Sequence, residues 1–144
     1  MSQRSIRDII QGQALFTTRA DTTVRDACCR MAEARVGAIL VVEPSGLLKG
    51  IFTERDALNR VLARSLDPDT TPLSQVMTPD PRSVDAEHPL GYALHLMHIG
   101  GYRHMPVTED GRPIGMVSVR DALGTEIVTF ERELEDFEKI AVAL

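Results

Sequence analysis

The sequence predicts a mixed α/β fold in which one unit of strands and helices occurs twice, followed by an amphipathic helix. Two cassettes, residues 50–56 and 115–121, share a glycine, a Thr or Ser, an arginine and an aspartate at one offset of about 65 residues. Agreement at a fixed offset is the signature of an internal repeat. The chain has 144 residues, of which 43% are hydrophobic, so each copy of roughly 60 residues is marginal alone. We therefore expect the two copies to bury their apolar faces against each other.

The first copy, residues 5–64, shows the full order of elements. Val24, Ala27, Cys28 and Met31 recur at the spacing i, i+3, i+4, i+7, which indicates an amphipathic helix, and Thr23 supplies N-cap chemistry before it. The aliphatic run at 36–42 is typical of a strand buried on both faces. In order, we expect a helical turn at 5–10, an extended segment at 13–18, a helix from 24, strands at 36–42 and 47–53, and a helix at 55–63.

The second copy, residues 73–124, repeats this order after a linker at 65–72 that holds two prolines and two aspartates. The helical spacing recurs at Leu90, Ala93, Leu94 and Met97, and Pro89 is expected at the first helical position, which tolerates proline. The strand at 104–107 is aligned with residues 39–42 of the first copy. Together the two copies predict paired lobes with Asp56 and Asp121 in symmetry-related clefts.

The tail, residues 125–144, has a different pattern. Its apolar residues fall at alternating steps of three and four, which is the spacing of a helix with one narrow apolar seam: Ile127, Phe130, Leu134, Phe137, Ala141 and Leu144. Two heptads are too few for an independent coiled coil. We expect the seam to dock either on the body of its own chain or on a second subunit, with a homodimer as the preferred assembly.

Charge and composition exclude several classes of protein. The net charge of −5 and the pI near 5.3 argue against a nucleic-acid-binding surface, which normally has a basic excess. No apolar run approaches the roughly 20 residues of a membrane span, and the first residues contain no signal-like segment. We therefore expect a cytoplasmic protein that binds neither membrane nor nucleic acid.

Several coupled motifs resemble a tandem pair of CBS domains, also called a Bateman module, of the stand-alone type known from bacteria and archaea. They are the entry at 76–79, the strand at 102–107, the acidic-Gly turn, and both Gly-x-x-Thr/Ser-x-x-Asp endings. The resemblance covers residues 5–124. It implies two β-α-β-β-α repeats packed sheet against sheet about a pseudo-twofold axis, with adenosine-containing ligands in two clefts between them.

Thr53 with Asp56, and Ser118 with Asp121, are the first candidate binding residues. A carboxylate at a strand-to-helix junction can accept from both ribose hydroxyls, and the Thr or Ser hydroxyl can bind sugar or phosphate near a helix N-terminus. The alternative is structural, because Asp is also a favoured helix cap. The motif alone leaves both roles open.

The resemblance also implies a phosphate and adenine environment. Arg55, Arg103 and Arg120 are candidate phosphate ligands, because a guanidinium forms a planar fork of donors. His104 adds a further basic group from the second copy, and these groups are expected to serve both clefts. The residues expected around the adenine and its approach are Ile51, Met116, Gly37, Ala38 and Tyr102.

No pattern in the sequence indicates catalysis or a cofactor. His95 and His98 are three residues apart on the second long helix, but a third metal ligand at fixed spacing is missing. There is no nucleophile elbow, no zinc-protease motif and no phosphate loop with lysine. Two functions remain: a non-catalytic sensor of AMP, ADP, ATP or a related adenosyl compound, or a structural dimerisation module whose clefts stay empty.

Overall fold

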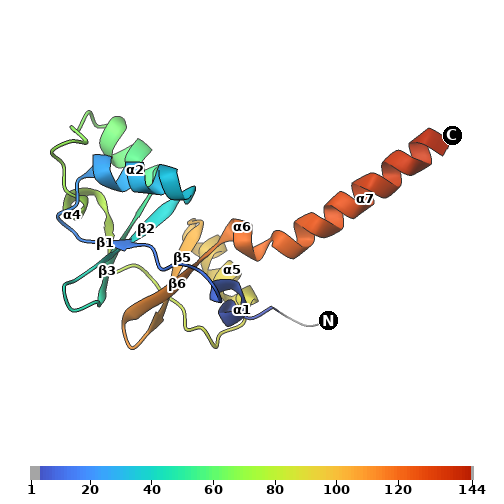
Figure 1. Ribbon diagram of the computed structural model, residues 1–144, viewed down its shortest axis with the longest axis horizontal. Helices are drawn as coiled ribbons and strands as arrows, with labels where there is room; N and C mark the ends of the chain where they lie inside the picture. The colour runs from blue at the N-terminus through green and yellow to red at the C-terminus, as the bar shows by residue number, and fades with distance from the viewer. Residues whose placement is uncertain (1–3, 144) are drawn as a thin grey trace.

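A computed structural model describes residues 4–143 of the chain, with the side chains of residues 125–128 outside that description. It has two α/β lobes side by side and one long helix that projects from them (Figure 1). The first lobe holds a sheet in the order β1-β2-β3-β4. Its strands are β1 (Thr17–Thr18), β2 (Ala38–Val42), β3 (Leu48–Thr53) and β4 (Thr78–Pro79). β1 is parallel to β2, and the other pairs are antiparallel.

The second lobe repeats this arrangement, but its sheet has only the two hairpin strands, and an isolated bridge replaces the pairing of an outer strand. β5 (His104–Glu109) and β6 (Arg112–Ser118) form an antiparallel hairpin. Val84 makes a single parallel bridge to Val107 of β5 and stands where β1 stands in the first lobe. The helices are α2 (Val24–Ala34) and α3 (Glu54–Asp56), which continues as the π-helix η1 (Ala57–Leu62), and in the second lobe α5 (Leu90–Gly100) and α6 (Val119–Ala122). Pro89 is the N-cap of α5 rather than its first residue, because its backbone is extended.

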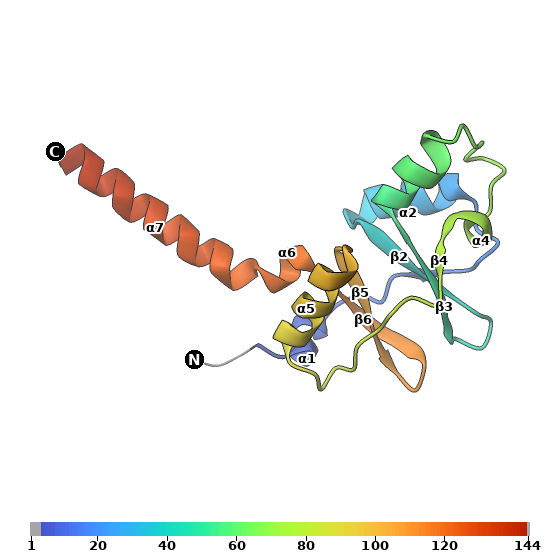
Figure 2. The ribbon, with the colours of Figure 1, turned by 180° about the vertical axis from the view of Figure 1, so that it is seen from behind.

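The leading segment of each repeat packs in the core of the other lobe. Ile6 and Ile10 of α1 (Ile6–Ile10) are buried with Val117 of the second lobe. Leu73 of α4 (Leu73–Val76) is buried with Phe52 of the first lobe. The views from both sides show this exchange, with α1 beside α5 and α4 beside β3 (Figures 1 and 2). The two lobes are therefore tied together by their own chain as well as by their shared face.

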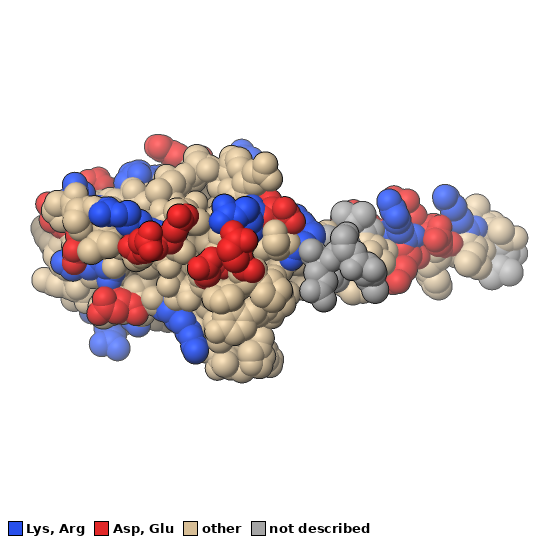
Figure 3. All heavy atoms as spheres, turned by 90° about the horizontal axis from the view of Figure 1, so that it is seen from below, with Lys and Arg blue, Asp and Glu red and all other residues tan. Residues whose placement is uncertain are grey.

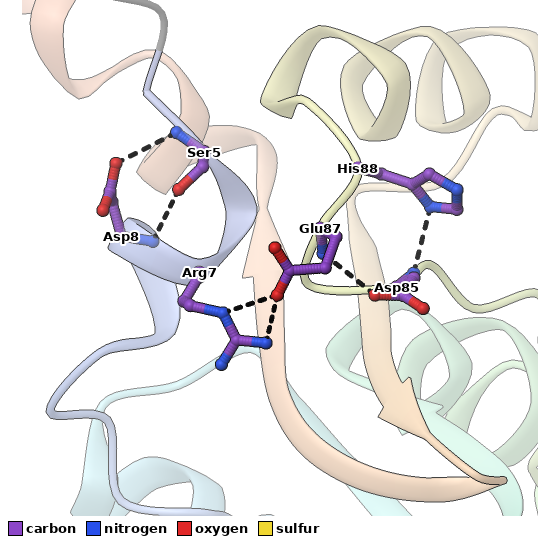
Figure 4. Close-up of polar contacts among 6 residues, drawn as sticks. All are labelled: Ser5, Arg7, Asp8, Asp85, Glu87 and His88. Atoms are coloured by element: carbon purple, nitrogen blue, oxygen red, sulfur yellow. Dashed lines mark hydrogen bonds and ion pairs between the residues drawn. The ribbon is translucent and has the colours of Figure 1, made fainter.

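Polar contacts fasten α1 to the second lobe. The guanidinium of Arg7 donates to the carboxylate of Glu87, which precedes α5 (Figure 4). At the start of the helix, the Ser5 hydroxyl accepts from the N–H of Asp8 at 3.1 Å, and the Asp8 carboxylate accepts from the N–H of Ser5 at 3.1 Å. This reciprocal pair is a capping box, which satisfies two N–H groups that a helix start leaves open.

The exchange explains why each cassette begins with glycine. A Cβ on Gly115 would lie 2.7 Å from the Cβ of Ile10, and a Cβ on Gly50 would lie 2.5 Å from the Sδ of Met77. Real Cβ atoms do not approach other atoms so closely. The two glycines therefore make room for the leading segments of the opposite repeats.

The lobes meet through the inner faces of their hairpins. Ala38, Leu40 and Ile51 form a buried cluster on which Met116 of the second lobe packs. The N–H of Leu48 donates to the carbonyl oxygen of Gly111 at 2.9 Å, which joins the two hairpins by their backbones. The expected face-to-face burial of two marginal lobes is confirmed.

The alignment of the two repeats differs by one residue from the expectation. Ala38 pairs with Thr53 and His104 pairs with Ser118, so His104 matches Ala38 and not Ile39. Arg103 then matches Gly37, and their carbonyl oxygens accept equivalent bonds of 2.9 Å from the N–H groups of Val119 and Glu54. The physical reason is that the hairpin turn of the second copy is one residue shorter, which only the strand pairing reveals.

The tail forms α7 (Gly124–Ala143), which leaves the body after a break in helical geometry at Leu123. Residues 129–143 are exposed along their whole length, so they do not fold back on either lobe (Figure 1). Of the two expected docking modes, packing on its own body is therefore wrong for these residues. The side chain of Ile127 and residue Leu144 lie outside the described part. Within the described residues, no helix has the length and apolar character needed to cross a membrane.

Candidate functional site

Two clefts open between the lobes, and each takes one wall from each repeat. The smaller, of about 320 Å³, lies between the β3–α3 junction and the start of β5. The larger, of about 1050 Å³, lies between the β6–α6 junction and the start of β2. Volumes of this order are typical of small-molecule sites.

The structure brings nearly all of the predicted site residues to these clefts. The smaller cleft is lined by Ile51, Thr53, Arg55, Asp56, Tyr102, Arg103 and His104. The larger cleft is lined by Gly37, Arg103, His104, Met116, Ser118, Arg120 and Asp121. Ala38 is the exception, because its side chain is fully buried between the lobes and reaches neither cleft. The side chain of Ala38 is enclosed because β2 is buried on both faces at that point, and its place beside the adenine stays a prediction.

The Thr/Ser-x-x-Asp motifs form capping boxes in both repeats. The Thr53 hydroxyl accepts from the Asp56 N–H at 3.2 Å, and the Asp56 carboxylate accepts from the Thr53 N–H at 2.9 Å. Ser118 and Asp121 make the same pair at 3.0 and 3.3 Å. The structural role left open by the sequence is therefore real, although Thr53 and Ser118 are the N-caps and the aspartates stand three residues inside. Each box uses one oxygen of its carboxylate.

The second oxygen of each carboxylate differs between the clefts. Oδ1 of Asp56 lies 3.6 Å from Nε of Arg60, and the Asp56 side chain is only 15% exposed. Asp121 is exposed, and within the described residues its Oδ1 makes no hydrogen bond or ion pair. A diol bound in the larger cleft would meet an available carboxylate oxygen, whereas one in the smaller cleft would share its carboxylate with Arg60.

The two helix N-termini differ in what they add to these sites. α6 has four residues and then breaks at Leu123, whereas α3 continues as η1, so residues 54–62 are helical throughout. Because the helix dipole is the sum of aligned peptide units, α6 attracts an anion less than the longer helix at the smaller cleft does. The cationic side chains of each cleft add to this field.

Cationic side chains outnumber carboxylates in each cleft, although the whole chain carries a net charge of −5. The smaller cleft is lined by Arg55, Arg60, Arg82 and Arg103 against Glu54 and Asp56. The larger is lined by Arg35, Arg103 and Arg120 against Glu54 and Asp121. On the face of the body that Figure 3 shows, the two signs are interspersed. The clefts are local positive sites suited to an anionic ligand.

Arg103, His104 and Glu54 line both clefts and form a ridge between them. Gly37 packs closely on this ridge, because a Cβ there would lie 3.1 Å from Glu54 Oε1 and from His104 Nε2. Burial lowers the pKa of His104 below its ordinary 6.5, while the carboxylates of Glu54 and Asp121 oppose that shift and Arg103 adds to it. The first repeat has Gly37 at the position that corresponds to Arg103, so it supplies no equivalent arginine. Arg103 is therefore the one arginine of this ridge, and it lines both clefts.

Other lining residues carried little or no signal in the sequence. The side-chain amide of Gln13 donates to the carbonyl oxygen of Met116 at 2.9 Å and accepts from its N–H at 3.2 Å. It thus replaces the backbone pairing that Thr78 makes with Ile51 in the first lobe. Arg60 donates to the carbonyl oxygens of Val76 and Met77 at 3.1 Å. Of these contacts, only the ion pair of Arg60 with Asp56 could be read from the sequence, because the two residues are four apart on a helix.

The described residues contain no group of three or more His, Cys, Asp or Glu side chains placed to hold a metal ion. His95 and His98 lie exposed on α5. Each cleft is an open space lined by hydrogen-bond acceptors and by arginine side chains. Chemically, it can hold a ligand that combines an anionic group with neighbouring hydroxyls.

Known proteins with the same architecture share a family with this chain. The family model described as CBS domain matches residues 6–63 and 73–126. A CBS domain-containing protein of Arabidopsis thaliana, CBSCBSPB1, is 37% identical over 142 residues, which cover 99% of this chain and 26% of that protein. The chain thus spans about a quarter of the length of that relative.

Solved structures agree with the family match. A protein with CBS domains from Burkholderia ambifaria has a TM-score of 0.80 at 28% identity, covering 87% of this chain and 95% of its own. A CBS domain protein from Pyrobaculum aerophilum complexed with AMP has a TM-score of 0.76 at 23% identity, covering 88% of this chain and 99% of its own. The latter likeness concerns the fold alone. With two matched repeats, two lobes and two clefts, the chain belongs to the CBS-domain family.

Proposed function

We propose that this CBS pair is a regulatory module that senses an adenine nucleotide or a related adenosyl compound and has no catalytic activity of its own. The observation that carries the proposal is the composition of the clefts. In each, a Thr/Ser-x-x-Asp box from one repeat faces Arg103, and arginines exceed carboxylates in a chain of net charge −5. A ribose phosphate offers the diol and the anion that this set of groups would bind.

The pose that follows places each part of the ligand on a named group. The ribose hydroxyls donate to the free oxygen of Asp121 in the larger cleft or to Asp56 in the smaller one. The phosphate accepts from Arg103 and from Arg120 or Arg55. The adenine lies between Met116 and Gly37 in the larger cleft, and between Ile51 and Tyr102 in the smaller. The AMP complex of the Pyrobaculum aerophilum neighbour supports this class of ligand.

The alternative function is an interaction module with unoccupied clefts. The capping boxes favour it, because they give Thr53, Asp56, Ser118 and Asp121 a structural task that needs no ligand. Arg60 has a structural role of this kind, because it donates to the carbonyl oxygens of Val76 and Met77. Within the described residues, the side chains of the other arginines of the clefts make no ion pair that would explain them: Arg35, Arg55, Arg82, Arg103 and Arg120. We therefore rank the sensor first, and we propose that it works as a cytoplasmic homodimer.

A thermal-shift panel tests the proposal directly. AMP, ADP, ATP, adenosine and S-adenosylmethionine are added to the chain, with GMP and inorganic phosphate as controls. A ligand at 100 times its Kd stabilises the native state by about 2.7 kcal/mol, which corresponds to roughly 5–10 °C for a protein of this size. Stabilisation by adenosyl compounds alone supports the sensor. If none of them raises the unfolding temperature, the interaction module replaces it.

A further inference from the structure

α7 carries an apolar stripe that nothing in the described part of the chain covers. Phe130, Leu134, Phe137 and Ile140 are 58–67% exposed. The helix stands away from both lobes in either view (Figures 1 and 2). Most of the stability of a helix in a protein comes from packing of its apolar face, and a row of exposed large apolar side chains marks an interaction surface. We therefore expect the stripe to be covered by a binding partner rather than by the described part of this chain.

Acidic residues border this stripe on both sides. Glu131 and Glu138 each follow a phenylalanine of the stripe, and Glu133 immediately precedes Leu134. At 3.6 residues per turn these three glutamates flank the seam, whereas Arg132 and Lys139 fall on the opposite face. From Gly124 onward the sequence has six acidic and two basic residues, so its formal charge is −4 of the chain's −5.

A second copy of this chain is a poor occupant for the stripe. In a parallel pair of α7 helices, Glu133 would face Glu138 of the second copy across the seam. In an antiparallel pair, Glu131 would face Glu138. Residues at these flanking positions select partner and orientation by charge, and like charges oppose pairing. Both arrangements place acid against acid, with no basic residue of the same helix within the flanks to compensate.

We propose that α7 is a docking helix for a basic amphipathic helix of another protein and is not the contact between two copies of this chain. The partner lays an apolar face along Phe130, Leu134, Phe137 and Ile140, and its Lys or Arg residues beside that face meet the three flanking glutamates. This is helix-to-helix recognition with charge complementarity at the rim. The concentration of negative charge on one projecting arm also steers a basic partner toward it.

The test uses the full chain and two synthetic helical peptides of about four heptads with Leu in the seam, one with Lys and one with Glu at all flanking positions. Binding is measured by fluorescence anisotropy. We expect the Lys-flanked peptide to bind about tenfold tighter or more, since each of several exposed pairs contributes a little. The difference should shrink at about 1 M salt, where the Debye length is about 3 Å.

Variants separate the stripe from its charge. Phe130→Ser with Phe137→Ser should abolish binding of the Lys-flanked peptide. Replacing Glu131, Glu133 and Glu138 by lysine should reverse the preference between the peptides. The matched control, Glu135→Lys with Asp136→Lys, changes acids away from the seam and should keep the preference.

Three results overturn the proposal: equal or absent binding of the two peptides, retention of the Lys-flanked peptide by the double serine variant, or a change in the chain's oligomeric state in that variant. The last result would make a second copy the occupant. None of these outcomes depends on nucleotide binding, so the experiment tests the docking helix independently of the proposed sensor function.

Discussion

Replacing Asp121 with alanine separates the two roles of this carboxylate, one in a capping box and one in the proposed ribose site. In the box, Asp121 accepts from the N–H of Ser118 at 3.3 Å. Loss of that long, exposed bond should lower the free energy of unfolding by about 0.5–1 kcal/mol, or the unfolding temperature by about 1–4 °C. In the proposed site, the same change removes a charged acceptor for two ribose hydroxyls. If that acceptor contributes about 2 kcal/mol, the Kd of the larger cleft rises about 30-fold.

The structure supplies a matched control for the capping role. Ser5 and Asp8 form the same type of box at α1, with both bonds at 3.1 Å, and neither residue lines the two clefts between the lobes (Figure 4). Asp8→Ala should therefore lower the unfolding temperature and leave nucleotide affinity unchanged. The comparison distinguishes a lost ligand contact from a general loss of stability.

Isothermal titration calorimetry with AMP measures affinity in the two variants and the unchanged chain, and differential scanning calorimetry measures the apo proteins. We expect weaker binding only in Asp121→Ala. The reasoning is refuted if Asp121→Ala binds AMP as the unchanged chain does, or if Asp8→Ala loses affinity to the same degree. In either case the motif is a helix cap and nothing more.

Four other changes test the remaining claims. Arg103→Ala should weaken AMP about tenfold in both clefts and leave adenosine nearly unaffected, because it removes a charge-assisted phosphate contact; calorimetry that shows equal losses for the two ligands would reject this role. Burial lowers the pKa of His104 below 6.5, so just below that pH the unfolded state binds more protons and stability should fall as pH drops from about 6.5 toward the lowered pKa. His104→Gln should flatten this part of the pH profile in urea unfolding, and an unchanged slope would count against it. Gly115→Ala should cost about 1–3 kcal/mol in urea unfolding, because the new Cβ would lie 2.7 Å from the Cβ of Ile10; a neutral result would show that α1 shifts freely. Truncation after Gly124 should leave the proposed dimer intact by light scattering, and a monomeric product from a dimeric full chain would place the dimer contact in α7.

Local patterns were sufficient to predict the repeat and the element order, and the family resemblance that they carry implied most of the residues around the clefts. Helical spacing, the aliphatic strand and the Thr/Ser-x-x-Asp boxes act within a few residues of chain, so their physics can be read directly from the sequence. The positions of the acidic residues along α7 can be read from the sequence in the same way. The cassettes predicted where Asp56 and Asp121 stand because a strand-to-helix junction is a local structure.

Only the tertiary structure decided which residues meet across the chain. The exchange of α1 and α4, the contact of Gly115 with Ile10, and the pairing of Gln13 with Met116 join residues that lie far apart in sequence. The match of Arg103 with Gly37 between the two repeats depends on a hairpin turn that is one residue shorter in the second copy, and only the strand pairing within each hairpin reveals it. Ala38 is buried and Arg103 lies on the ridge between the clefts, because strand pairing and packing between lobes, not local spacing, determine which side chains reach the site.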